Sequence, residues 1–327
     1  MSLGTAFEHA WKAWNRFWFR PYSAHTLAAI RIATGLMLAY VHAIWLYDIT
    51  AFMGPDAWID GETIRSLHSQ RSKWSYLWYI QSVPLLSLHQ VVAILASLAM
   101  AIGMGTRLVI PLVWFMTLMV CHRMTGLLFG LDQVVMMLSM YLMVSLCGAE
   151  WSWDAWWRDR TKRPTSFLFP ASRPDSWNTI ATRLMQLHLC VVYLFGGVSK
   201  LRGDMWWDGS ALWFAAASYE YQSLDLTWIG RYPTMTAFLT HITLFWETFY
   251  IATVWPKATR PWTLAMALMV HLGIAMFLGM ITFGSMMIVA NAAFIDPETT
   301  RRTSQVVRRW LGRSSSNTEL QSGQDRR

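Results

Sequence analysis

Charged side chains are scarce in this chain of 327 residues. They make up 14% of it, against about a quarter in an average soluble domain. Hydrophobic residues account for 54%, and several runs of roughly 18–22 apolar residues follow one another, each long enough to cross a bilayer. The weak ten-residue alternation of a transmembrane β-barrel is absent. The sequence therefore predicts an all-α, multi-pass helical bundle in the cell membrane.

Cysteine is also scarce, with three residues in the chain. Cys121, Cys147 and Cys190 lie inside apolar runs without CxxC spacing, which predicts small buried side chains. The 21 methionines form no cluster with His and Cys at ligand spacing, so no metal is predicted. Facing histidines on two helices, which a haem would need, are lacking too. No internal repeat is visible, which argues against an inverted-repeat transporter.

Acidic residues are fewer than basic ones, and the formal net charge is +8. The basic residues fall in short loops and a tail, which the positive-inside rule explains without any nucleic-acid partner. An eight-span topology places 18 Lys and Arg residues on the side of both termini and 7 on the other side. We therefore expect both termini in the cytoplasm and spans at about 25–47, 86–104, 108–128, 131–148, 178–201, 233–255, 261–281 and 282–296.

Segments outside these spans have compositions typical of a membrane interface. Residues 1–24 are predicted to form an amphipathic helix in the interface, without the cleavage site of a signal peptide. Residues 48–85 and 149–177 combine tryptophan and tyrosine with charges, so we expect them on the membrane surface. Residues 297–327 are polar and rich in Ser, Gln and Arg, which predicts a disordered cytoplasmic tail.

The most informative stretch is the later part of the apolar run 178–201 together with the residues that follow it up to 214. Its distinctive residues are Tyr193, Gly196, Gly197, Lys200, Asp204, Trp206, Trp207 and Gly209. Tyr193 and Lys200 are seven residues apart, two turns along one helix face, and the glycine pair leaves that face open to a helix or a ligand. An amine at the end of an apolar helix either snorkels to the interface or faces a cavity.

Residues 188–209 resemble the HTTM family, which is the transmembrane domain of vitamin K-dependent γ-glutamyl carboxylase and its bacterial relatives. The shared pattern is a His-containing helix, a Tyr, a glycine pair, Lys-Leu, an acidic residue, Trp and Gly. The likeness extends over about 25–296. An early arginine (Arg31), a Glu after the lysine motif (Glu247) and a His before a Phe/Gly/Met run (His271) match in order and rough spacing.

The resemblance implies that Lys200 is the base that deprotonates a reduced quinone similar to vitamin K hydroquinone. Oxygen would then give an epoxide and a strong base, and CO2 would add to a substrate glutamate. Such a base must be a neutral amine, which burial in an apolar cavity favours. Tyr193, Asp204, Trp206, Glu247 and His271 are expected to line the pocket. Only residues 297–327 follow the spans, so the resemblance implies membrane chemistry rather than docking of a large protein substrate.

Other polar residues leave alternatives open. Arg31 is either a snorkelling arginine at the cytoplasmic face or the buried partner of a carboxylate such as Asp132. Asp132 is either a helix cap or, with His122, part of a cavity wall on the extracytoplasmic side. Glu247, near the middle of an apolar run, must be protonated or paired. His271 is either an interhelical hydrogen-bonding residue or a pocket residue.

Three functions fit these features. The first is a membrane enzyme of the carboxylase type with Lys200 as base, a quinone or lipid-like ligand, and an apolar cavity that reaches Lys200 from the extracytoplasmic side. The second is a non-catalytic membrane factor for maturation or export of a secreted peptide, whose activity would survive Lys200→Ala. The third is a transporter, whose cavity would open to alternate sides. The oligomeric state is left open.

Overall fold

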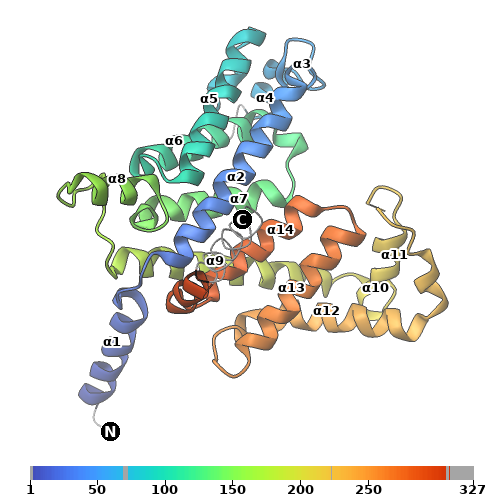
Figure 1. Ribbon diagram of the computed structural model, residues 1–327. Coiled ribbons are helices and arrows are strands. Elements are labelled where there is room, and N and C mark those ends of the chain that lie inside the picture. Colours follow the sequence, from blue (N-terminus) through green and yellow to red (C-terminus); the bar gives the residue numbers. More distant parts are fainter. Residues whose placement is uncertain (1–2, 69–72, 222, 307–308, 310–327) are drawn as a thin grey trace, which may run out of the picture.

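The computed structural model describes residues 3–68, 73–221, 223–306 and 309, and this part of the chain folds as helices without a β-strand (Figure 1). An isolated antiparallel bridge joins Tyr22 to Asp175, so the chain just before α2 (His25–Tyr47) is tied to the residue that precedes α9 (Ser176–Lys200). The all-α fold predicted from composition and hydropathy is confirmed.

Each predicted span coincides with a helix whose ends lie within a few residues of the predicted ones. Besides α2 and α9, these helices are α5 (Val83–Ile102), α6 (Thr106–Arg123), α7 (Gly130–Val144), α12 (Pro233–Thr253), α13 (Arg260–Phe277) and α14 (Ile281–Asn291), the last continued by η5 (Ala292–Phe294). The amphipathic stretch near the N-terminus forms α1 (Leu3–Phe19). Hydrophobic periodicity and run length therefore located the helices well.

Four of these helices, α2, α5, α9 and α13, are long and apolar enough to cross a membrane. The others fall short for different reasons. At about 1.5 Å per residue, the 15 residues of α7 reach only about 22 Å, less than a hydrocarbon core of about 30 Å. Charged or polar residues lower the hydropathy of α6 and α12, Arg107 and Arg123 in the first and Glu247 in the second. The count of eight spans and the placement of the termini stay predictions.

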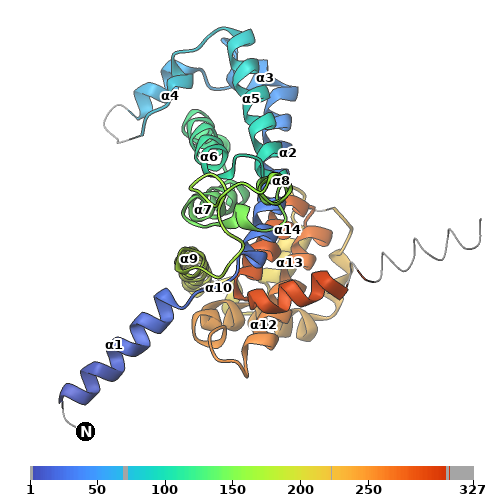
Figure 2. The same ribbon diagram turned by 60° about the vertical axis from the view of Figure 1, so that its left-hand side comes forward.

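The long helices pack in pairs: α2 lies against α5, α9 against α12, and α13 against α14. In both views α1 extends away from the rest of the molecule (Figures 1 and 2). Its exposed side chains include Phe7, Trp11 and Trp14. Arg183 of α9 holds the C-terminal end of α1. Its guanidinium Nε donates to the Phe17 carbonyl at 3.1 Å, and the guanidinium carbon lies 4.3 Å from the centroid of the Phe17 ring.

Arg31 in α2 is fully buried, which excludes a snorkelling arginine. Its guanidinium donates to the carbonyl oxygens of Cys147 at 2.9 Å and Trp151 at 2.6 Å, in the segment that follows α7. The arginine neither snorkels nor pairs with Asp132. Backbone carbonyls satisfy it instead.

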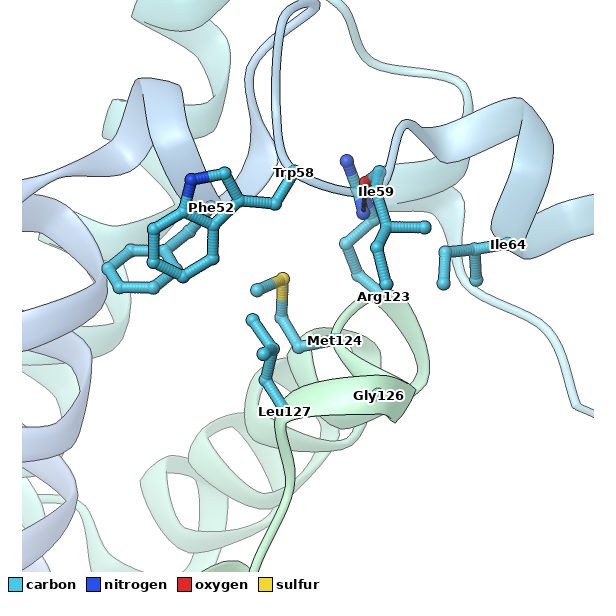
Figure 3. Close-up of a pocket in the computed structure, with 8 residues that line it drawn as sticks. All are labelled: Phe52, Trp58, Ile59, Ile64, Arg123, Met124, Gly126 and Leu127. Carbon is cyan, nitrogen blue, oxygen red and sulfur yellow. Dashed lines mark hydrogen bonds between the residues drawn. The ribbon is translucent and has the colours of Figure 1, made fainter. Parts of the chain in front are cut away.

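The described residues between 48 and 85, which are 48–68 and 73–85, form a lobe beside α5 and α6. The lobe contains α3 (Ile49–Met53), α4 (Gly61–Leu67) and η1 (Tyr76–Trp78). Arg123, at the end of α6, secures this lobe by donating to the carbonyls of Ile59 at 2.9 Å and Met53 at 3.3 Å. A narrow hollow remains between the lobe and the end of α6 (Figure 3). Its lining residues are Phe52, Trp58, Ile59, Ile64, Arg123, Met124, Gly126 and Leu127.

Two short helices follow α9: α10 (Asp204–Trp207) and α11 (Ala211–Ala217). Gly209 lies between them in a left-handed conformation at φ 83°. One local prediction needs correction. Residues 297–306 are helical rather than disordered, since Glu298 pairs with Arg301 at 2.8 Å one turn along. The rest of the tail, apart from residue 309, lies outside the described residues.

Candidate functional site

Lys200 ends α9 and forms an ion pair with Glu247 of α12. Its Nζ lies 2.8 Å from Glu247 Oε2, and the two side chains are 29% and 14% exposed. The ammonium also lies 5.4 Å from the centroid of the Trp206 ring, within cation–π range. Of the two options for Glu247, protonated or paired, the structure has the pair. Lys200 thus has a carboxylate partner, whereas the carboxylase resemblance implies a neutral amine.

The glycine pair of α9 makes this ion pair possible. A Cβ atom on Gly196 would lie 2.4 Å from Glu247 Oε1, so a larger residue would displace the carboxylate. A Cβ atom on Gly197 would lie 2.7 Å from the Cα atom of Thr248, so a larger residue there would push the backbone of α12 away. The first glycine makes room for a functional group, and the second makes room for a helix.

A chain of buried hydrogen bonds lies next to the ion pair. Tyr193 Oη lies 2.8 Å from His271 Nε2 on α13, and Asn291 Nδ2 on α14 donates to the same oxygen at 2.8 Å. Tyr250, three residues after Glu247, donates to Asn291 Oδ1 at 2.6 Å. Four helices therefore contribute to one polar network, in which Tyr193, Tyr250, His271 and Asn291 are all buried.

The ion pair and this network are close enough to influence each other. The charge of Glu247 acts on Tyr193, and the charge of Lys200 acts on His271. Tyr193, Lys200 and Gly196 share one face of α9 at positions i, i+7 and i+3. Aromatic rings fill the space around the network: the Trp246 ring lies 5.2 Å from that of Tyr193 between centroids.

The structure brings together five of the residues predicted for the site: Lys200, Glu247, Tyr193, His271 and Trp206. We call this group, with Asn291 and Tyr250, the Lys200 cluster. Asp204 is exposed at the start of α10, and the carboxylate that Lys200 meets is that of Glu247 instead. Arg31 contacts the segment after α7, as described above.

Asp132 and His122 also lie outside the Lys200 cluster, and each makes a hydrogen bond to a backbone group. Asp132 Oδ2 accepts a hydrogen bond from the Phe129 N–H at 3.0 Å, so the alternative of a helix cap holds. His122 Nδ1 donates to the Trp74 carbonyl at 2.7 Å and helps to hold the lobe of residues 48–85. Neither residue lines the hollow at the end of α6 or the polar recess described below.

The Trp-Trp-Asp-Gly sequence after Lys200 shapes a turn. Trp207 Nε1 donates to the Leu201 carbonyl at 2.8 Å, and Asp208 Oδ1 accepts from the Ser210 N–H at 2.8 Å and hydroxyl at 2.6 Å. These hydrogen bonds hold the pKa of the Asp208 carboxyl below its usual value. The turn places Trp206 against the Lys200 ammonium.

Sequence reasoning missed Tyr250 and gave Asn291 no role in the site. A signal for each was present. Tyr250 follows Glu247 by three residues and must share its helix face, and Asn291 is an amide inside an apolar helix, where a polar group needs a partner. What the sequence could not supply was which helices meet, and this decides which polar groups find each other.

Chemically, the Lys200 cluster can accept, hold and pass on a proton. A carboxylate and an ammonium in contact can exchange one proton. The adjoining Tyr, Asn and His side chains can donate and accept hydrogen bonds in series. Within the described residues no group of three or more His, Cys, Asp or Glu side chains could hold a metal ion.

A larger recess lies at the opposite end of α9 and is not part of this cluster. It has an empty volume of about 1450 Å³ that opens to solvent. Four segments line it, at 23–25, 150–159, 172–174 and 298–305. It contains the His25–Glu150 ion pair, with an N–O distance of 3.6 Å.

In comparisons with known proteins, no family model matches this chain, and no curated protein or solved structure matches it. The resemblance to the carboxylase family therefore rests on the residues quoted above.

Proposed function

We propose that this chain is a multi-pass membrane enzyme that takes a proton from a hydroxyl group of a quinol or a similar lipid-like molecule at the Lys200 cluster. The observation that supports this most strongly is the Lys200–Glu247 ion pair, half-buried at the end of an apolar helix and adjoined by a buried Tyr–His–Asn network.

The ion pair is the base in this proposal. Glu247 can take the proton directly, or it can first take one from Lys200 and leave the amine to act. Both routes end in the same state, with a protonated Glu247 and a positive Lys200. In that state the ammonium stabilises the negative charge left on the ligand, and it does so more strongly in an apolar site than in water.

The residues around the pair fit a reduced quinone. Such a ligand is flat and apolar with two oxygen atoms, and the cluster offers aromatic side chains with a few convergent polar groups. When bound, a reduced quinone supplies the hydroxyl proton and two electrons for O2. Lys200 and Glu247 would bind one oxygen, and Trp206 and Trp246 would pack on the apolar part. Further use of CO2 rests on the family resemblance.

We further propose eight spans in the cell membrane with both termini in the cytoplasm. The polar recess supports this topology, because segments from the start of α2, from 149–177 and from the tail line it together, at one end of the bundle. Lys200 lies 24 residues along α9 from Ser176 at that end. In the proposed orientation Lys200 is therefore on the extracytoplasmic side.

The test is oxygen uptake by the purified chain in lipid nanodiscs, with a reduced 1,4-naphthoquinone as substrate. We expect Lys200→Ala and Glu247→Gln each to lower the rate by about 100-fold or more, the usual contribution of a positioned acid–base group. Arg202→Ala is the matched control, because Arg202 is a second cation two residues away and is exposed. Full uptake in Lys200→Ala would refute the enzyme and favour a non-catalytic role in maturation or export of a secreted peptide.

A further inference from the structure

The orientation of the Asn291 amide is fixed by a neighbour that can only accept. Asn291 Nδ2 lies 2.8 Å from the Met287 carbonyl oxygen, and a carbonyl has no proton to donate. The nitrogen must therefore be on that side, and Oδ1 faces the Tyr250 hydroxyl, which donates to it at 2.6 Å. The second proton of the amide points to Tyr193 Oη at 2.8 Å.

This orientation sets the direction of the next hydrogen bond. Tyr193 Oη already accepts from Asn291, and its own proton needs an acceptor because the hydroxyl is buried. His271 Nε2, at 2.8 Å, is its partner on the other side. His271 is buried, and burial disfavours a charged imidazolium, so the imidazole is neutral. With Nε2 accepting, the single ring proton of His271 must be on Nδ1.

That Nδ1–H group has no hydrogen-bond partner in the described part of the chain, although His271 is only 4% exposed. A buried donor without an acceptor destabilises the fold, and native proteins keep such groups rarely. The ring lies 6.0 Å from that of Phe283 between centroids, in an edge-to-face arrangement, so its surroundings are aromatic as well as polar.

We infer that His271 Nδ1–H is a ligand-binding donor, and that it hydrogen-bonds to a carbonyl or hydroxyl oxygen of a flat apolar ligand at the Lys200 cluster. The hydrogen-bonded chain Tyr250–Asn291–Tyr193 positions this donor, because it sets the tautomer of His271 and leaves the Nδ1–H group available to a ligand. The identity of the ligand as a quinone rests on the proposed function. The tautomer of His271 does not depend on that identity.

The first experiment observes the tautomer. In the full chain labelled with 15N-histidine in nanodiscs, a spectrum assigned with His271→Asn should show the His271 proton on Nδ1 at neutral pH. Tyr193→Phe removes the donor to Nε2, and we expect a mixture of both tautomers there. A wild-type proton on Nε2, or a doubly protonated ring, would overturn the inference.

The second experiment measures binding of oxidised 1,4-naphthoquinone, which offers carbonyl oxygens and no proton. Asn places an amide nitrogen near the position of histidine Nδ1, whereas Leu has no donor, so the two variants form a matched pair. We expect His271→Leu to weaken binding by about tenfold, the worth of one hydrogen bond, and His271→Asn to stay within about threefold of wild type. Equal binding by wild type and a folded Leu variant, or no binding by wild type, would overturn the assignment.

The two proposals can fail separately. If the quinone binds through His271 but Lys200→Ala leaves oxygen uptake unchanged, the acid–base role is wrong and the binding site stands. If Lys200→Ala abolishes uptake while His271→Leu binds the quinone as wild type does, the enzyme stands and the role of His271 is wrong.

Discussion

Gly196→Ala tests the Lys200–Glu247 pair without removing either charge. The new methyl group would lie 2.4 Å from Glu247 Oε1 and 3.8 Å from Lys200 Nζ. The amine can stay where it is, but the carboxylate cannot. Because ordinary contacts begin near 3.4 Å, the oxygen must move by about 1 Å, and a flexible glutamate side chain can do this without moving α12.

The expected effects on stability and on activity differ in size. Alanine stabilises a helix interior by about 0.5–1 kcal/mol relative to glycine. Weakening a hydrogen-bonded ion pair costs about 1.5–3 kcal/mol, and less where water screens it. The net loss of stability should therefore stay below about 2 kcal/mol. A displacement of 1 Å in a catalytic group can lower a rate by about 100-fold, so activity should fall far more than stability.

Gly197→Ala is the matched control on the next residue. Its methyl group would lie 2.7 Å from Thr248 Cα and 2.8 Å from Thr248 N, which are backbone atoms that move only with α12. We expect it to destabilise the fold by about 1–3 kcal/mol, the usual cost of overpacking.

Both variants are measured by thermal unfolding and by oxygen uptake with reduced 1,4-naphthoquinone. Wild-type uptake in a folded Gly196→Ala variant would show that the position of the carboxylate does not matter, and the proposed base would then be wrong.

Two further predictions concern residues outside the cluster. Arg31→Met leaves the carbonyls of Cys147 and Trp151 without their buried donor, so unfolding in denaturant should become easier by about 3 kcal/mol. Asp132→Asn should change stability by less than about 1 kcal/mol, and an Arg31→Met loss no larger than this would contradict the role given to Arg31. Arg301 and Arg302 lower the pKa of Glu298 to about 2, and a carboxyl group with a lowered pKa in the folded state stabilises that state at pH values above its unfolded pKa, near 4.5. The helix at 297–306 should therefore lose stability as the pH falls from 4.5 towards 2. A side-chain 13C titration of Glu298 with a midpoint near 4.5 would contradict this.

Much of the fold was predictable from the sequence because the length of a hydrophobic run and the residues that begin or end a helix are local features of the chain. The apolar run at 25–47 begins and ends where α2 does, and the others were placed within a few residues. The conformation of Gly209 was not predicted, because a positive φ depends on how closely α12 packs against it.

The site was predictable only in part, for a physical reason. Tyr193, Lys200 and Gly196 share a helix face, so their proximity follows from spacing alone. The choice of Glu247 rather than Asp204 as the partner of Lys200 depends on the contact between α9 and α12, which sequence spacing does not contain. Arg31 shows the same limit, since backbone carbonyls bind it and carry no residue-specific signal.

The Lys200 cluster draws one residue or more from each of α9, α12, α13 and α14. A ribosome completes α14 only after the other three helices have left it, so a nascent chain that stops before Asn291 would leave the hydroxyls of Tyr193 and Tyr250 without their shared amide. The polar centre is therefore complete only when Asn291 of α14 has reached the two tyrosines of α9 and α12.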